Sequence, residues 1–170
     1  MAKVFNNWIQ MQYDIEAKMD VALDNTLERL LQELQLIIDR TVYGWQSPSS
    51  SPWGWGETGG NRTHEFYESW QRTKPIILGN LLQGEIYQAV ELMTYNFKGG
   101  HPIHEDRENL ADIIETGQGY NFGQAEGIGR EFWSEFEMYC NLNLHNIFLQ
   151  ECGKVGLNLT PSVGVTATFL

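Results

Sequence analysis

The sequence has few cysteines and no long apolar run, and each shortage excludes a class of protein. Its two cysteines, Cys140 and Cys152, fall in one segment. On a single helix they would lie about 18 Å apart along the axis, whereas a disulfide needs Cα atoms within about 7 Å. We therefore expect free thiols in a reducing compartment. No apolar run reaches the roughly 18 residues of a membrane-spanning helix, and the first residues do not form a signal peptide, so we expect no membrane contact.

Basic residues are also scarce, since 11 Lys and Arg stand against 22 Asp and Glu, for a net charge of −11. Nucleic-acid binding requires cations that neutralise phosphates, and the basic residues here are scattered. Specific DNA or RNA binding is therefore not expected. An acidic surface repels DNA, which suits a conduit through which DNA slides, but it equally suits any soluble acidic protein.

The clearest element is a long amphipathic helix over residues 8–43. Glycine is absent before Gly44 and proline is absent throughout, and an apolar stripe recurs at spacings of four, three, four and three at Leu23, Leu27, Leu30, Leu34 and Ile37. This period favours a helix with one face on the core. Contact between copies of the chain is the alternative for its first turns, which carry Phe5, Trp8, Ile9 and Tyr13.

Residues 44–61 are rich in serine, proline and glycine and read as a long loop. The loop contains Trp45, Trp53 and Trp55. Long loops without structure of their own are usually functional or disordered, and disordered linkers rarely hold three tryptophans. We expect this loop to dock on its own domain or on a neighbour. An aromatic platform for carbohydrate is the alternative.

The middle of the chain predicts a small antiparallel β-sheet of two or three strands. Residues 63–71 alternate weakly, and residues 81–97 read as extended. Because the second segment exceeds the usual length of a strand, a bulge or bend is expected near Gly84 or Gln88.

The C-terminal part predicts two helices and a tail. A short helix is expected over 105–116. Its first turn is acidic, which the helix dipole favours at an N-terminus, and Gly117 supplies the C-cap. A long helix is expected over 130–152, with Gly153 at its end. Residues 155–170 read as a terminal strand or an extended arm.

This order of elements predicts a single α+β domain over residues 1–170, with a body at 1–154.

Residues with metal-binding or catalytic chemistry form one weak cluster. His101, His104, Glu108 and Asp112 include pairs four residues apart, which share a face of a helix and could hold zinc in a small metal-dependent enzyme. The metalloprotease spacing His-Glu-x-x-His is absent, and neither a nucleophile elbow nor a phosphate-binding lysine loop is present. We therefore expect no enzyme and no cofactor.

Residues 110–132 carry a family resemblance. Leu110-Ala111, Ile114-Glu115 and Gly117, followed after a glycine-rich loop by Arg130-Glu131-Phe132, fit the pattern Tyr/Leu-Ala-x-x-Ile/Val-Glu-x-Gly and an Arg-Pro-Phe-like step. Upstream matches are Thr41-Val42-Tyr43, Ser47-Pro48 and Arg62-Thr63. In this respect the chain resembles the tail-completion, or tail-to-head joining, neck proteins of long-tailed bacteriophages. It departs from them where Glu131 replaces the proline, in its longer tryptophan-containing loop, and in the extra residues 155–170.

The resemblance implies a structural protein of the virion, assembled in the host cytoplasm. Such a protein would form a ring of six copies in the neck and join the head-side connector, or stopper, to the tail terminator or tail tube. Packaged DNA would pass through the ring without specific binding. Rings are built from head-to-tail contacts between two different patches, and an arm that completes a neighbour's sheet is one way to make them.

The candidate interface residues follow from the resemblance, the loop and the tail. They are Ala111, Glu115, Gly117, Arg130, Phe132, Trp45, Trp53, Trp55, Phe169 and Leu170. We interpret Glu115 as a positioning residue that bonds backbone amides or a basic group of a neighbour, with Gly117 as the helix cap.

Overall fold

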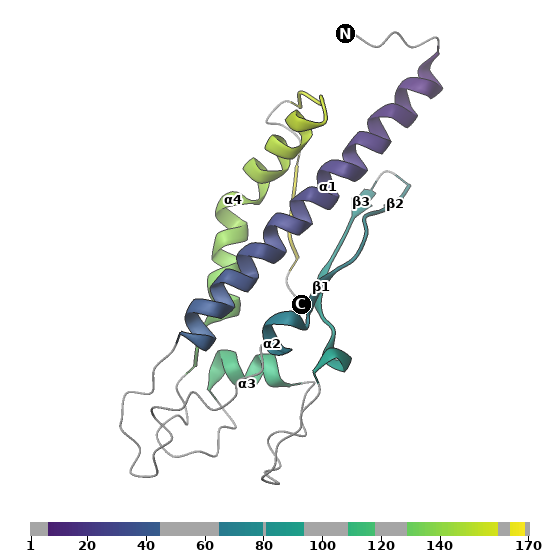
Figure 1. Ribbon diagram of the computed structural model, residues 1–170. Helices are drawn as coiled ribbons and strands as arrows, with labels where there is room; N and C mark the ends of the chain where they lie inside the picture. The colour runs from purple at the N-terminus through teal and green to yellow at the C-terminus, as the bar shows by residue number, and fades with distance from the viewer. Residues whose placement is uncertain are drawn as a thin grey trace, which may run out of the picture. The chain divides into compact units, whose positions relative to one another are not determined.

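The computed structural model describes residues 7–44, 65–79, 81–93, 109–117, 129–159 and 164–168. Over these residues the fold is α+β, as the sequence predicts, with long helices near both ends of the chain (Figure 1). In chain order the elements are α1 (Trp8–Ile38), a π-helical turn (Asp39–Tyr43), α2 (Glu65–Glu68), β1 (Trp70–Arg72), β2 (Ile76–Leu78), β3 (Leu81–Gln83), β4 (Ile86–Gln88), a 3-10 turn (Val90–Leu92), α3 (Leu110–Thr116) and α4 (Phe132–Lys154).

The chain divides into two compact units. Unit 1 comprises Met1–Leu31, Arg72–Ile86 and Tyr139–Leu170, and unit 2 comprises Gln32–Gln71 and Tyr87–Met138. Both α1 and α4 contribute residues to each unit. The two units are described separately below.

The core of unit 1 lies between the first part of α1 and the second part of α4. Ala22, Phe148 and Cys152 form a buried cluster, which is surrounded by partly buried apolar side chains: Met19, Leu23, Val155, Leu157, Leu159 and Val165. Both cysteines are buried free thiols, as expected from the sequence. Burial raises the pKa of Cys152, and the negative charge of Glu151 raises it further.

A buried carboxylate joins the two helices of unit 1. The Glu151 side chain is 2% exposed and accepts hydrogen bonds from Arg29 of α1 at 2.8 Å and from Lys154 at 2.7 Å. Burial by itself raises the pKa of Glu151, but the hydrogen bonds and charges of Lys154 and Arg29 outweigh it and hold the pKa below its ordinary value. Glu151 is therefore ionised at neutral pH.

The C-terminal end of α4 differs from the prediction that Gly153 ends the helix. The helix continues through Gly153 to Lys154, and Gly156 takes the left-handed conformation with φ 79°. Leu157 N–H bonds to the carbonyl of Cys152 at 2.8 Å, and Gly156 N–H bonds to that of Gly153 at 3.1 Å. This pair of bonds is a Schellman motif, in which the left-handed residue is a glycine. That glycine is Gly156, not Gly153.

The predicted tail, residues 155–170, is partly described. Residues 157–159 and 164–168 form neither helix nor strand. Four apolar side chains of the tail pack on the core cluster of their own unit. The described part of the tail therefore contributes to the core, which corrects the expectation that it is only an appended arm. Phe169 and Leu170 lie outside the described residues.

Over the described residues the β-structure consists of four strands of three residues, whereas the sequence predicts two or three longer strands. β2 pairs with β3 antiparallel, with Ile77 opposite Leu82, and β1 pairs with β4. The expected break at Gly84 lies between β3 and β4. The extended segment ends at Gln88 instead of continuing through the predicted range 81–97, because a 3-10 turn follows at Val90–Leu92.

The prediction of a strand over residues 63–71 is wrong for its first part. Residues Glu65–Glu68 form a helical turn, α2, and only Trp70 begins a strand. Ser69 closes the turn, since its N–H bonds to the carbonyl of Glu65 at 2.8 Å and its hydroxyl donates to the carbonyl of Phe66 at 2.8 Å. These local bonds outweigh the weak alternation of the sequence.

The core of unit 2 combines aromatic and aliphatic side chains. Phe66, Trp70 and Phe132 pack edge to face, with ring centroids 5.5 to 6.2 Å apart. The end of α1 contributes the buried aliphatic side chains Leu34, Ile37 and Ile38, and the π-helical turn that follows contributes Val42. The predicted stripe therefore lies on the core face of α1.

Candidate functional site

The candidate site is the junction of α3 and α4 in unit 2, where the residues that carry the family resemblance meet. Helix α3 begins at Leu110, because Asn109 has the non-helical angles φ −101° and ψ 6°. Gly117 ends the helix in the left-handed conformation with φ 71°, and its N–H bonds to the carbonyl of Ile113 at 2.9 Å. The predicted glycine cap is confirmed.

The chain returns to this same helix end at Gly129 and Arg130. The backbone N–H of Arg130 bonds to the carbonyl of Ile114 at 2.9 Å. A Cβ atom at Gly129 would collide with the backbone carbonyl of Glu115. Glycine is therefore required here by a close approach of two backbone segments, and carbonyls at the end of α3 gain partners that the helix itself does not supply.

Glu115 connects the two helices directly. Its carboxylate accepts hydrogen bonds from the backbone N–H of Trp133 at 2.8 Å and from that of Ser134 at 3.0 Å, and also from the Ser134 hydroxyl. Trp133 and Ser134 are the second and third residues of α4, whose N–H groups have no partner within the helix. Glu115 therefore acts as an N-cap for α4, supplied by another helix.

The charge of Glu115 suits this position, because the N-terminus of a helix carries a partial positive charge. The interpretation that Glu115 bonds backbone amides is thus confirmed within the chain. The resulting geometry fixes the start of α4 and with it Phe132, which is 1% exposed. Trp133 stacks on Trp70 with ring centroids 5.3 Å apart.

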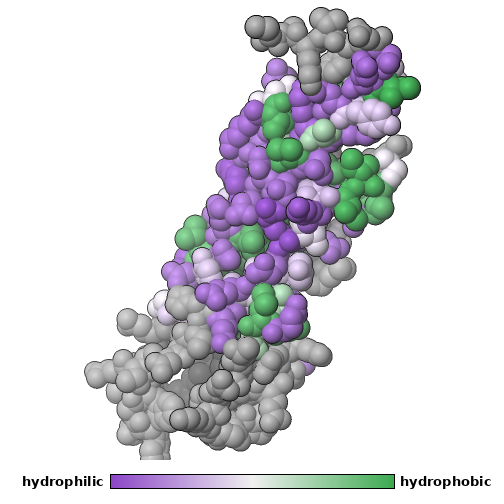
Figure 2. Space-filling model, turned by 45° about the vertical axis from the view of Figure 1, so that its right-hand side comes forward, coloured by the Kyte–Doolittle hydropathy of each residue, from purple (hydrophilic) through white to green (hydrophobic). Residues whose placement is uncertain are grey.

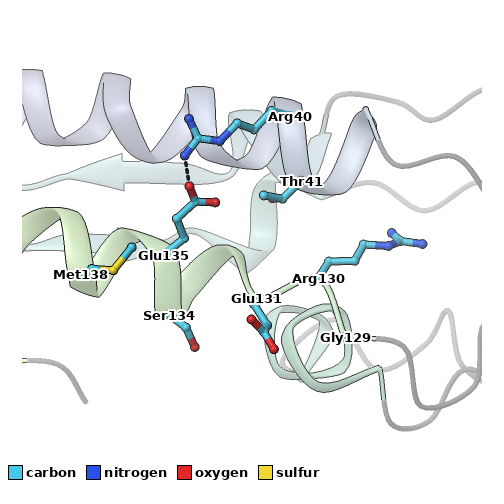
Figure 3. A pocket seen from close by; sticks show the side chains of 8 residues that line it. All are labelled: Arg40, Thr41, Gly129, Arg130, Glu131, Ser134, Glu135 and Met138. Carbon is cyan, nitrogen blue, oxygen red and sulfur yellow. Dashed lines mark hydrogen bonds and ion pairs between the residues drawn. The ribbon is translucent and has the colours of Figure 1, made fainter.

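A hollow of about 630 Å³ lies beside this junction within unit 2. It is lined by Arg40, Thr41, Gly129, Arg130, Glu131, Ser134, Glu135 and Met138. Figure 3 shows Arg40, near the end of α1, and Glu135, from α4, pointing toward each other in an ion pair. Among the described residues the lining presents both cationic groups, from Arg40 and Arg130, and anionic groups, from Glu131 and Glu135.

The structure brings together four of the candidate interface residues and changes the role of one. Glu115, Gly117, Arg130 and Phe132 meet at the junction, and Ala111 is half-buried on α3. Phe132 is a core residue of its own unit, so its side chain is not available to a partner, contrary to the expectation. Trp45, Trp53 and Trp55 lie outside the described residues.

Two residues of the junction were missed at the level of sequence. In the sequence Gly129 is one of several glycines in the loop before Arg130, and the close approach that requires it depends on long-range packing. Ser134 is the third residue of α4, a position where a side chain or ligand commonly meets the free amides. The signal in the sequence was Glu115, the acidic residue two positions before Gly117, which indicated a bond to backbone amides.

Of the four residues proposed as metal ligands, only Asp112 lies among the described residues. His101, His104 and Glu108 lie outside the described residues, and Asp112 is exposed on α3. Within the described ranges, His, Cys, Asp and Glu side chains nowhere gather in the groups of three that could hold a metal ion. In the same ranges, no helix combines the length and apolarity needed to cross a bilayer.

Comparison with protein-family models, curated protein sequences and solved structures finds no match to this chain.

Proposed function

We propose that the chain is a structural protein of the head–tail connector, or neck, of a long-tailed bacteriophage. In this role it forms a ring, of six copies by analogy with the resembling family. The ring joins the head-side connector or stopper to the tail terminator or tail tube. DNA passes through its lumen without specific binding.

The α3–α4 junction is the observation that carries this proposal. The two parts of the resembling pattern, residues 110–117 and 130–132, are separated in sequence but form one hydrogen-bonded joint. The glutamate of the first part caps the helix that begins with the phenylalanine of the second. The two parts of the pattern thus belong to one structural joint, and this supports the resemblance.

The chemistry of the junction also favours a structural role over an enzymatic one. The carboxylate of Glu115 is engaged by two backbone N–H groups and a hydroxyl, so it is not placed to transfer protons to a substrate. The net charge of −11 suits a conduit, because DNA is repelled from an acidic wall, as it suits other acidic proteins.

Immunogold electron microscopy tests the proposal on virions produced from the genome that carries this gene. Antibodies against the purified chain should place gold at the junction of head and tail, and antibodies from the same animal before immunisation should leave particles unlabelled. Because a neck protein is partly covered, particles separated into heads and tails by mild denaturation are labelled as well. Gold on capsid faces or tail fibres, or no gold on intact and separated particles, would overturn the neck function.

A further inference from the structure

Unit 1 exposes two apolar surfaces that its own described residues do not cover. The first, the hairpin patch, consists of Ile76, Ile77, Leu78 and Leu81, which are 46% to 57% exposed. The second, the helix-start patch, consists of Trp8, Ile9 and Tyr13, which are 61% to 71% exposed. Clusters of large exposed apolar side chains in a water-soluble unit mark interaction sites.

The hairpin patch is unusual because it is apolar on both faces. Residues that alternate along a strand point to opposite faces, so Ile77 and its partner Leu82 lie on one face, and Ile76, Leu78 and Leu81 on the other. A hairpin that only packed against its own core would be apolar on one face. Figure 2 shows hydrophobic residues gathered where β2 and β3 lie.

The helix-start patch lies where α1 extends beyond the packing of its unit. Residues 7–10, 12 and 13 are all exposed, and Met11 is half-buried. Burial on α1 becomes complete at Ala22. The first turns of α1 therefore present tryptophan, isoleucine and tyrosine with no core face of their own, and aromatic residues of this kind are enriched at interfaces.

The charge distribution indicates that the partner of these patches is another copy of the chain. Two copies each carry a net charge of −11, so they repel each other in most orientations. Residues 1–13 contain no acidic residue and one lysine, and residues 69–84 contain no acidic residue and two basic ones. The two exposed apolar segments are thus free of acidic groups, and contact between them brings together no carboxylates.

The positions of the patches within unit 1 also match. Arg72 at the base of the hairpin bonds to Glu28 at 2.8 Å and pairs with Asp24 of α1. From there β2 and β3 extend toward the N-terminal end of α1 (Figure 1). The chain from Arg72 to Leu78 reaches up to about 20 Å when extended, and Tyr13 is about 16 Å from Asp24 along the helix axis.

Both patches therefore lie at about the same level of unit 1. In a ring, neighbouring copies are related by rotation about one axis, so two patches that meet must lie at equal heights along it. An axis that runs along α1 meets this condition.

We propose that the hairpin patch of one copy docks on the helix-start patch of the next, with the α1 helices of neighbouring copies side by side. This head-to-tail contact deepens the proposed function, on which it rests, by assigning the surfaces that build the ring. It is a heterologous interface, because two different patches meet.

Two variants and their mixture test this assignment. The hairpin variant carries Leu78→Thr and Leu81→Thr, which keep strand propensity, and the helix variant carries Ile9→Gln and Tyr13→Gln, which keep helix propensity. Leu142→Gln is the matched control, because Leu142 is 70% exposed in unit 1 and lies outside both patches. Circular dichroism establishes that each variant keeps the wild-type helix content.

Sedimentation velocity then measures assembly over a wide concentration range. The wild type and the control should form oligomers, and each variant alone should self-associate at least about tenfold more weakly. An equimolar mixture of the two variants should form a one-to-one dimer and stop there, because one intact interface remains per pair. Added salt should strengthen wild-type assembly, because it screens the acidic repulsion.

Three outcomes would overturn the proposal: a monomeric wild type, variants that assemble like the control, or a mixture that remains monomeric. The last outcome would show that the two patches do not bind each other, whereas stable dimers of each variant alone would indicate that like patches pair with like. Gold at the neck together with unaffected variants would refute this interface alone. Dimer formation in the mixture without gold on virions would refute the neck function alone.

Discussion

The cap that Glu115 supplies to α4 yields the sharpest prediction about stability. Replacement by alanine removes the acceptor of two backbone N–H groups, those of Trp133 and Ser134, and leaves both at the start of the helix. Replacement by glutamine keeps one oxygen acceptor but removes the charge. Because the two amides bond to different oxygens, the glutamine variant loses one acceptor and the charge, whereas the alanine variant loses both acceptors and the charge.

The expected magnitude follows from the exposure of these groups. Loss of an N-cap costs about 1 kcal/mol, and loss of an anion at a helix N-terminus costs about 0.5 kcal/mol. The Ser134 hydroxyl is exposed, so water replaces its bond to Glu115 at little cost. We expect Glu115→Ala to lower the free energy of unfolding by about 1.5 kcal/mol and Glu115→Gln, which loses the charge and one of the two acceptors, to lower it by about 1 kcal/mol.

Urea denaturation provides the assay, followed both by circular dichroism and by tryptophan fluorescence. The fluorescence reports directly on the junction, since Trp133 is stacked on Trp70. Glu137→Ala and Glu137→Gln are the matched controls, because Glu137 lies on α4 with exposure in the same range as Glu115. If Glu115→Ala and Glu137→Ala differ by less than about 0.5 kcal/mol, a typical surface effect, the cap does not stabilise the junction and the reasoning fails.

Three further predictions concern the packing around the two helices. Gly129→Ala should destabilise the chain by about 2 kcal/mol in urea denaturation, since the added methyl collides with the Glu115 carbonyl; Gly153→Ala, where a Cβ meets nothing within 4 Å, is its control and should have no such cost. Because the pKa of Glu151 is lowered in the folded state, its stabilising effect is present above the ordinary value of 4.5 and is lost as the pH falls below it. The difference in unfolding free energy between wild type and Glu151→Gln should therefore shrink on acidification, and a constant difference across pH would contradict the ion pairs with Arg29 and Lys154. Deletion of residues 155–170 should lower the melting temperature and cost about 4 kcal/mol, because four partly buried apolar side chains leave the core; an unchanged melting temperature would show that the tail is only an arm.

The sequence determined the parts of the fold whose information is local. The stripe of α1 and the buried face of α4 recur with the helical period over many residues, so their pattern is clear without knowledge of their partners. The end of α3 was equally readable, because a glycine after a short helix commonly caps its C-terminus. The acid at Glu115, two residues before that glycine, indicated a bond to backbone amides.

The sequence failed where elements are short or where a competing local bond intervenes. Strands of three residues are too short for alternation to be distinguished from chance, so β2 was missed. A break near Gly84 or Gln88 was expected, but the extended segment was wrongly carried on to residue 97. At α4, Gly153 and Gly156 are both candidate caps by composition. Only the pair of bonds at Cys152 and Gly153 selects the second.

The sequence by itself thus determined the α+β class, the three main helices and the identity of the capping pair Glu115 and Gly117. Only the tertiary structure decided which amides Glu115 bonds, that Gly129 must be glycine, and that the tail packs on the cluster with Cys152. The physical reason is the distance along the sequence between the residues that interact. Helical period and caps depend on residues within a few positions, whereas these contacts join segments whose approach is fixed only when the core has formed.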